Sequence, residues 1–351
     1  MYVCLYLCIY RRSNTIHLTI SISVMMMRMI ISALLSLHVQ SILAYSSQSS
    51  VVETTTRREI LTNLSTGAIA ALAFFQKPST SYALDELELE IGSPSRPVAI
   101  IGGGGRTGMA VAETLASDQG ARLHSVIMTR SGKDPFQIVK LPPTTKERLS
   151  LFQRPVDVRD AEGVLAAMKE SNPSVIVYAA SASKQGGNSF DVDDGGVENV
   201  ARACKVVGAK LVLISALALD RPNSKSYKIT NTIGGYLDKI MDAKLNGETK
   251  VKEILGNNYI IIRPGVLLSG KSKNGASDIE LNQGDTIGGG LSRDELAGVV
   301  CGAIESKKKG ITVEAYRTST KTKLQPEFVI PSGNELVAPT YSGLFDQAKS
   351  D

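Results

Sequence analysis

The run from Val98 to Val111 constrains the fold of this chain more than any other stretch of its sequence. Val98 to Ile101 are apolar and predict a buried strand, and the residues at the end of the run predict the opening of a helix. Between them Gly102, Gly105 and Gly108 recur as G-x-x-G-x-x-G. Glycines here leave backbone N–H groups open to a phosphate, and the helix that follows supplies partial positive charge. The run therefore predicts a phosphate-binding turn of the kind that holds a dinucleotide.

Apolar strands alternate with amphipathic helices downstream of this turn, which strengthens a glycine pattern that is weak by itself. Predicted strands are 98–102, 124–129, 174–180, 210–215, 259–263 and 311–316, and predicted helices are 107–118, 160–171, 194–207, 229–255 and 292–306. This alternation predicts an α/β fold, a doubly wound parallel sheet of the Rossmann type in a single domain with a small C-terminal substrate lobe. Ligands of such sheets bind at the carboxyl ends of the strands.

The charge of the chain is unevenly distributed. The formal net charge is +5, from 39 Lys and Arg against 34 Asp and Glu, but residues 1–83 hold six of the basic residues and two of the acidic ones. The remainder is close to neutral, with 33 basic and 32 acidic residues. We therefore expect no nucleic-acid surface on it. Cys204 and Cys301 fall in helical patterns and the chain has three histidines, so we expect neither a disulfide framework nor a metal site.

The first 83 residues are predicted to be targeting sequence. Residues 1–44 predict a signal peptide, with Arg28 ahead of an apolar segment and a small residue, Ala44, before the cleavage point; translation could instead start within Met25–Met27. Residues 45–83 are rich in Ser and Thr and poor in acids, as in a plastid transit peptide. Together the two segments resemble the bipartite plastid leaders of algae with secondary plastids.

A second signal overlaps the transit peptide. Arg57 and Arg58 precede an apolar run from Ala68 to Phe75 and a small-x-small site at Ser81–Ala83, which resembles a twin-arginine signal for the thylakoid lumen. The alternatives are an incidental arginine pair in an ordinary transit peptide, with the protein in the stroma, and an apolar stretch that merely anchors the protein. The apolar run is too short to predict a membrane span, so none is expected in the mature protein. Residues 84–97 predict a linker, 98–316 the dinucleotide-binding domain and 317–351 a C-terminal tail.

A series of short motifs, ordinary one by one, occurs in a specific order along residues 98–316. Besides the glycine turn with Arg106 and Thr107, the motifs are Val156–Asp160, Ala179–Ser181, Ile214–Ala216, Lys244–Glu248, Ile262–Gly265 and Leu291–Asp294. In this order they resemble the atypical short-chain dehydrogenase/reductase superfamily, in its NmrA-like NAD(P)-binding group. The resemblance implies a Rossmann fold with a bound NAD(P)(H) and a small-molecule substrate.

The resemblance also implies roles for individual residues. Asp157 and Val158 would hold the adenine, and Ala179, Ala180 and Ser181 would line the cofactor. Arg130 closes the second strand, where NAD-specific relatives place an acid for the ribose 2′-hydroxyl. A guanidinium there, with Arg106 and Lys133 nearby in the sequence, suits a 2′-phosphate and favours NADP(H) over NAD(H).

The predicted catalytic residues are incomplete. Ser215 matches the serine that orients a carbonyl in active members, and Lys244 matches the lysine that lowers the tyrosine pKa and holds the ribose. Four residues before Lys244 stands Ile240, so the Tyr-x-x-x-Lys pair is missing. Tyr227 and Tyr236 lack the spacing to replace it. Lys244 could bind the ribose, or simply pair with Glu248 at i+4.

Three functions are consistent with these residues. The preferred one is an NADP(H)-dependent oxidoreductase acting on a small or apolar plastid metabolite. The main alternative is a non-catalytic NADP-binding protein that senses redox state or assists assembly of photosynthetic complexes. A sugar-nucleotide epimerase is disfavoured, because that chemistry also needs the Tyr-x-x-x-Lys pair. Substrate contacts are expected from 182–190, 217–235 and 266–290; the sequence identifies neither the substrate nor the oligomeric state.

Overall fold

The computed structural model describes residues 7–12, 15–20, 91–117, 122–270, 274–329 and 335–351. It divides into two compact units, Met1–Ser79 and Thr80–Asp351. The described part of the first unit is an antiparallel pair, β1 (Leu7–Arg12) with β2 (Thr15–Ile20). Apart from this pair, the predicted signal peptide (1–44) and transit peptide (45–83) lie outside the described residues, as do residues 84–90 of the predicted linker.

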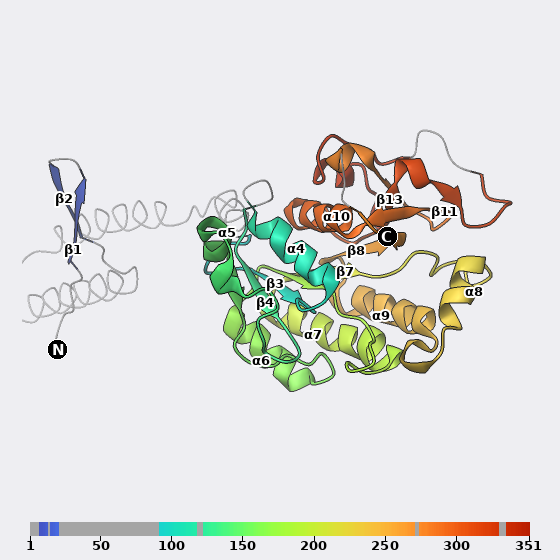
Figure 1. Ribbon diagram of the computed structural model, residues 1–351, viewed down its shortest axis with the longest axis horizontal. Helices are drawn as coiled ribbons and strands as arrows, with labels where there is room; N and C mark the ends of the chain where they lie inside the picture. The colour runs from blue at the N-terminus through green and yellow to red at the C-terminus, as the bar shows by residue number, and fades with distance from the viewer. Residues whose placement is uncertain (1–6, 13–14, 21–90, 118–121, 271–273, 330–334) are drawn as a thin grey trace, which may run out of the picture. The chain divides into compact units, whose positions relative to one another are not determined.

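The second unit is built on one large sheet (Figure 1). Its strands are β3 (Val98–Ile101), β4 (Ser125–Met128), β5 (Leu149–Leu151), β6 (Val175–Tyr178), β7 (Lys210–Ile214), β8 (Tyr259–Pro264), β10 (Ile279–Asn282) and β13 (Ile311–Arg317). The α-helices are α4 (Arg106–Ala116), α5 (Pro143–Arg148), α6 (Ala161–Ser171), α7 (Val197–Val207), α8 (Lys225–Asn231), α9 (Ile240–Leu255) and α10 (Arg293–Glu305). Short elements complete the described fold: β9 (Val266–Leu268) with β12 (Gly290–Ser292), β11 (Ile287–Gly288) with β14 (Thr322–Lys323), a π-helix η2 (Phe190–Gly196), and the 3₁₀ turns η1 (Ile138–Lys140), η3 (Gly235–Leu237), η4 (Gly275–Asp278), η5 (Thr318–Thr320) and η6 (Gly343–Phe345).

The strand order confirms the predicted doubly wound sheet. The order is β10-β13-β8-β7-β6-β3-β4-β5, and all neighbours are parallel except β10, which runs antiparallel to β13. From β3 the chain builds outward through β4 and β5, then returns to the other side of β3 to form β6. Loops leaving β3 and β6 therefore diverge, which opens a crevice at their carboxyl ends.

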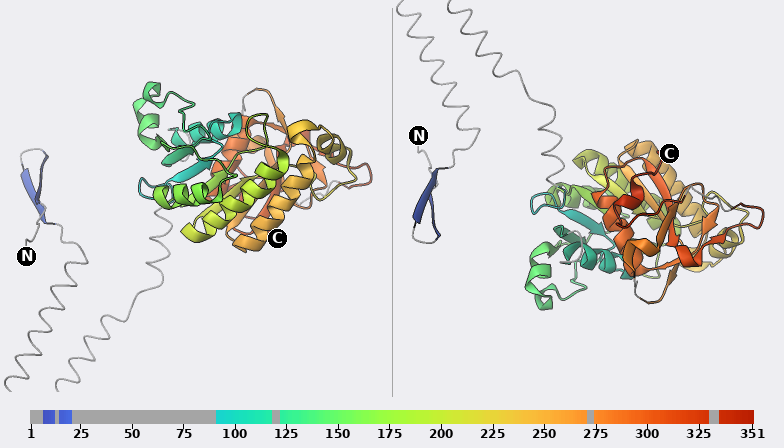
Figure 2. Two further views of the ribbon diagram at one scale, coloured as in Figure 1. Left: turned by 90° about the horizontal axis from the view of Figure 1, so that it is seen from below. Right: turned by 90° about the horizontal axis from the view of Figure 1, so that it is seen from above.

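Two apolar layers cover the sheet, one on each face. One face packs against α4 and α10, through residues such as Ile100, Val111 and Val299, and the other against α6, α7 and α9, through residues such as Ile101 and Val200. Seen from below, α6, α7 and α9 lie side by side (Figure 2, left). The eight-stranded sheet and the described hydrophobic clusters lie within Thr80–Asp351, so we expect this unit to fold by itself.

The predicted elements are largely confirmed, with two differences in the helices. The predicted helix over 229–255 is two helices, because Gly234 and Gly235 adopt positive φ angles of 77° and 63° and separate α8 from α9. The helix predicted from 194 starts as the π-helix η2 and becomes α-helical at Val197. The sequence analysis did not predict β5 or the antiparallel strand β10.

The segment predicted as a C-terminal tail, 317–351, packs on the α10 face of the sheet. Leu344 and Phe345 are buried there. Asp351 accepts hydrogen bonds from the Thr312 N–H (2.8 Å) and the Tyr259 hydroxyl (3.0 Å). Among the described residues, no helix has the length and apolar character needed to cross a bilayer.

Candidate functional site

The glycine turn brings strand β3, helix α4 and strand β6 into close contact. Gly102 has φ = 78°, and a Cβ there would lie 2.6 Å from the Ala180 nitrogen. A Cβ on Gly108 would lie 2.4 Å from the Gly102 oxygen. Only glycine fits these two positions without displacing backbone. The first N–H groups of α4, which have no partner inside the helix, follow this turn at the mouth of the crevice.

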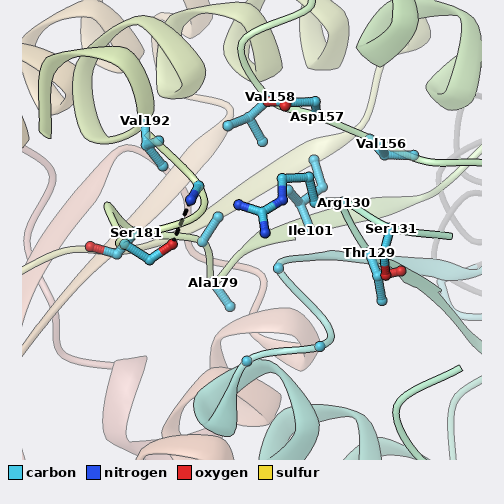
Figure 3. Close-up of a pocket in the computed structure, with 16 residues that line it drawn as sticks. Ile101, Thr129, Arg130, Ser131, Val156, Asp157, Val158, Ala179, Ser181 and Val192 are labelled. Carbon is cyan, nitrogen blue, oxygen red and sulfur yellow. Dashed lines mark hydrogen bonds between the residues drawn. The ribbon is translucent and has the colours of Figure 1, made fainter. Parts of the chain in front are cut away.

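A pocket of about 380 Å³ lies in this crevice (Figure 3). Its walls are the turn after β3, the loop after β4, the segment from Val156 to Val158, and the loop after β6. Eight of the residues predicted to bind the cofactor line it: Gly102, Gly105, Arg130, Asp157, Val158, Ala179, Ala180 and Ser181. Arg106, Thr107, Gly108, Ser215 and Lys244 are not part of its lining. The structure thus gathers residues from four separate stretches of sequence into one cavity.

Arg130 extends from the end of β4 into this pocket (Figure 3). A Cβ added to Gly186 would lie 2.9 Å from one of its Nη atoms, so the guanidinium reaches across to the loop after β6. Within the described part of the chain, its guanidinium makes no hydrogen bond and no ion pair. The pocket therefore presents a cationic donor fork that is free to bind an anionic group.

The carboxylate of Asp157 already has a partner. Arg159 donates to it from Nε (2.9 Å) and from Nη2 (2.6 Å). This hydrogen bonding lowers the pKa of Asp157, and the charge of Arg130 adds to the effect. Asp157 is therefore ionised at neutral pH, and a bound adenine amine would share this carboxylate with Arg159.

A buried aspartate organises the other end of the loop after β6. Asp193, in the π-helix η2, accepts hydrogen bonds from the Ser181 hydroxyl (2.9 Å) and the Ala182 N–H (2.8 Å). Lys244 of α9 forms an ion pair with the same carboxylate, at 2.6 Å. A Cβ on Gly247 would lie 2.3 Å from the backbone carbonyl oxygen of Asp193, so a glycine at this position lets α9 approach η2.

The alternative pairing of Lys244 with Glu248 is wrong. Glu248 is buried and binds Arg263, with Nη2 to Oε2 at 2.6 Å, while Lys244 binds Asp193. The helix turns these two side chains toward different partners, although they stand four residues apart. Lys244 remains a predicted ribose ligand, now with a specific internal partner.

The other residues considered for catalysis differ in their surroundings. Ser215 is buried at the end of β7, and its hydroxyl has no hydrogen-bond partner among the described residues. Tyr227 is buried and donates to the Asp242 carboxylate, and burial is the largest cause that raises the pKa of Tyr227 to about 12. Tyr236 is exposed, and Ile240 is buried where active relatives carry the tyrosine. No described tyrosine is thus spaced as the family pattern requires.

Sequence reasoning did not single out several residues of this region. The pocket is also lined by Thr129, Ser131, Ser183, Gly186 and Val192. Asp193 accepts a hydrogen bond from Ser181, another lining residue, and so holds its side chain in place. Ser183 and Gly186 fall within 182–190, which was expected to contact substrate. Asp193 stands among three aspartates between 191 and 194, and nothing in that local pattern separates a buried carboxylate from an exposed one.

A comparison with models of protein families identifies the family. A family model described as NAD(P)H-binding matches residues 102–307. No curated protein matches the chain.

Several solved structures are similar, all at low identity. A Rossmann-fold NAD(P)-binding family protein from Shigella flexneri is 19% identical, over 67% of this chain and 100% of that one, with a TM-score of 0.47. The oxidoreductase ylbE from Lactococcus lactis is 16% identical, over 65% and 92%, with a TM-score of 0.46. A wide-type short-chain dehydrogenase/reductase from Veillonella parvula, solved with NADP, is 16% identical, over 66% and 99%, with a TM-score of 0.46. The family match spans more than half of the chain and includes the glycine turn, the pocket segments and α9, so the chain belongs to the NAD(P)H-binding family.

Proposed function

We propose that this protein binds NADP(H) in preference to NAD(H) and acts as an oxidoreductase on a small or apolar metabolite. Arg130 carries the proposal: it places an unpaired guanidinium in the pocket, next to the turn where a pyrophosphate would bind. A ribose 2′-phosphate offers the charge and oxygen geometry that such a fork recognises. The cofactor would supply the hydride, and the protein would supply binding and orientation.

The targeting sequence supports a plastid location for this activity. The segments predicted as signal and transit peptide favour import into the plastid, and Arg57 with Arg58 leaves the thylakoid lumen as a possible destination beside the stroma. Fluorescent fusions carrying residues 1–83 ahead of a reporter test this location. A reporter left in the cytosol or secreted would contradict it.

A second function, a non-catalytic NADP-binding protein, is favoured by a different observation. Lys244 is bound to Asp193, and Tyr227 is bound to Asp242. Both groups that could move a proton thus have carboxylate partners inside the protein. Such a protein would use the dinucleotide for structural support or to sense redox state while it assists photosynthetic-complex assembly.

Calorimetric titration of the Thr80–Asp351 unit with NADPH and NADH tests the cofactor. We expect NADPH to bind at micromolar strength and NADH much more weakly. Equal affinities would contradict the role of Arg130, and no binding of either would contradict the dinucleotide site. With binding established, oxidation of NADPH in the presence of candidate carbonyl substrates separates the oxidoreductase from the non-catalytic protein.

One glycine of the turn provides a variant for this titration, and an exposed residue of α4 provides its control. A Cβ on Gly105 would lie 3.2 Å from the Gly102 oxygen, in the turn that lines the pocket. Gly105→Ala should weaken both nucleotides about tenfold or more, because backbone and phosphate must approach closely there. Glu113→Gln, on an exposed position outside the pocket lining, should leave binding within about threefold of wild type. Equal losses in the two variants would place the phosphates elsewhere.

A further inference from the structure

We propose that the surface formed by α8 and the loop after it binds the anionic headgroup surface of a lipid bilayer. This surface, called the α8 patch, consists of Lys225, Lys228, Ile229, Ile233, Tyr236 and Lys239. It lies at the edge of the Thr80–Asp351 unit, with α8 packed beside α9 (Figure 1). The proposal does not depend on the nucleotide assignment.

The α8 patch exposes large apolar side chains. Ile229 is 58% exposed, Ile233 is 59% exposed and Tyr236 is 43% exposed. These three side chains fall within eight residues of sequence, whereas exposed apolar residues on protein surfaces are usually scattered singly. A tyrosine beside aliphatic side chains suits the boundary between headgroups and acyl chains, because its ring is apolar and its hydroxyl is polar.

The charge of the patch selects an anionic partner. Residues 225–239, which span the patch, contain Lys225, Lys228 and Lys239 against one acid, Asp238. The flanking acids are bonded inside the protein, Asp220 to Arg263 and Asp242 to Tyr227 and Asn231. Lys225, Lys228 and Ile229 lie at i, i+3 and i+4 on one face of α8. The ammonium groups of Lys225, Lys228 and Lys239 form no ion pair within the described residues. Cations beside exposed apolar groups are the composition that binds anionic bilayers.

Interactions beneath the patch hold it in this arrangement. The Ser224 hydroxyl caps α8, and Tyr227, on the opposite face from the patch, is buried and bonded to Asp242. The Asn231 side chain accepts from the Met241 N–H at 3.0 Å, and its carbonyl accepts from the Lys239 N–H at 3.2 Å, which closes the loop. Ile229, in α8, and Ile233, in the hydrogen-bonded loop after it, are therefore exposed without any rearrangement.

The patch is bonded to the segment that follows β6. The Ser189 hydroxyl donates to the Tyr236 carbonyl at 3.0 Å, and the next residue, Phe190, is half-exposed. A bilayer bound at the α8 patch would thus lie beside this segment.

Co-sedimentation with lipid vesicles tests this proposal, using the Thr80–Asp351 unit without added nucleotide. We expect binding to vesicles of phosphatidylcholine mixed with phosphatidylglycerol, and little binding to phosphatidylcholine alone. Ile229→Asp with Ile233→Asp should lower the partition coefficient at least tenfold. Lys225→Gln and Lys228→Gln should each lower it about fivefold, and added salt should weaken wild-type binding.

Val206→Asp is the matched control, because Val206 is 59% exposed near the end of α7 and does not belong to the α8 patch. It should bind vesicles like wild type, and thermal unfolding should show that all variants fold. Equal binding to neutral and anionic vesicles, or equal loss in Val206→Asp and in the Ile229/Ile233 variant, overturns the proposal. Failure of the wild type to bind either vesicle overturns it as well, and would leave an acidic protein surface to be tested as a separate partner.

Discussion

Two regions of the molecule differ in how many of their charged groups are already bonded inside the protein: the open end, at β3 and β6, and the closed end, at β7, β8 and α9. At the β3–β6 end, Arg130 and the glycine turn face an open pocket. At the β7–β8 end, Lys244, Glu248 and Arg263 are all held in internal ion pairs. The first end is arranged to receive an anionic ligand, whereas the second uses its charges to fix α9 and the loops around it. Nucleotide binding and proton transfer, which relatives of this fold combine, can therefore be separated experimentally here.

The largest effect on stability is expected from breaking the buried ion pair between Asp193 and Lys244. Asp193→Ala leaves Lys244 unpaired and removes the acceptor of the Ser181 hydroxyl and the Ala182 N–H, so it should destabilise the protein by about 3–5 kcal/mol. Urea unfolding measures this loss. Asp193→Ala combined with Lys244→Met should recover part of it, and simple additivity of the two variants would show that the pair is not coupled.

Reversing the charge of Arg130, at the open end, should change the affinity for the cofactor rather than the stability of the protein. Arg130→Asp should weaken NADPH about 10- to 100-fold, as expected when a charge-assisted hydrogen bond of about 1.5–3 kcal/mol is lost, and should change NADH far less. Calorimetry with both cofactors gives the comparison, and Arg202→Asp, on the exposed face of α7, serves as the control. Equal losses for both cofactors would remove the 2′-phosphate assignment.

The closed end should also give the protein a pH-dependent stability. Burial raises the pKa of Glu314 to about 8, with Asp285 adding to the shift and Arg263 opposing it. A carboxyl whose folded pKa exceeds its ordinary value near 4.5 binds more protons in the folded state than in the unfolded state. Its contribution to stability is therefore complete below about pH 4.5 and is lost as the pH rises toward 8. Glu314→Gln should flatten stability against pH in that window, while Glu113→Gln, exposed on α4, should not.

The smallest effect on stability is expected from substitution of Ser215. Its buried hydroxyl has no partner among the described residues, so Ser215→Ala should leave the free energy of unfolding unchanged or raise it by up to about 1 kcal/mol. Urea unfolding checks this. A loss larger than about 1 kcal/mol would mean that the hydroxyl is bonded in solution. If the protein is an oxidoreductase, the same variant should lose turnover of NADPH while keeping its stability.

The sequence predicted the open end better than the closed one, because the two ends rely on different kinds of signal. Gly102, Asp157 and Ala179 belong to contiguous motifs that follow strands, and parallel strands bring their carboxyl ends to one edge of the sheet. The pairing of Lys244 with Asp193 joins residues 51 positions apart, and helix spacing pointed to Glu248 instead. Contacts set by how two helices pack leave no short pattern to recognise.

The same reason limited the prediction of the C-terminal part of the fold. Proline residues in 317–351 favoured a tail, and neither the antiparallel strand β10 nor its isolated bridge to Leu336 has a strong alternating pattern. Burial of Leu344 and Phe345 depends on the shape of a surface made by α10 and the sheet. The local sequence of 317–351 carries no pattern that reveals such a surface.

Asp351 has a consequence for how the beginnings of two strands are held. Its carboxylate accepts from Thr312 in β13 and from Tyr259 in β8, and its N–H donates to the Gly310 carbonyl. One side chain thus bridges the amino ends of two adjacent strands. Without that carboxylate the Thr312 N–H and the Tyr259 hydroxyl lose these acceptors, so fraying of the sheet should begin at this bridge.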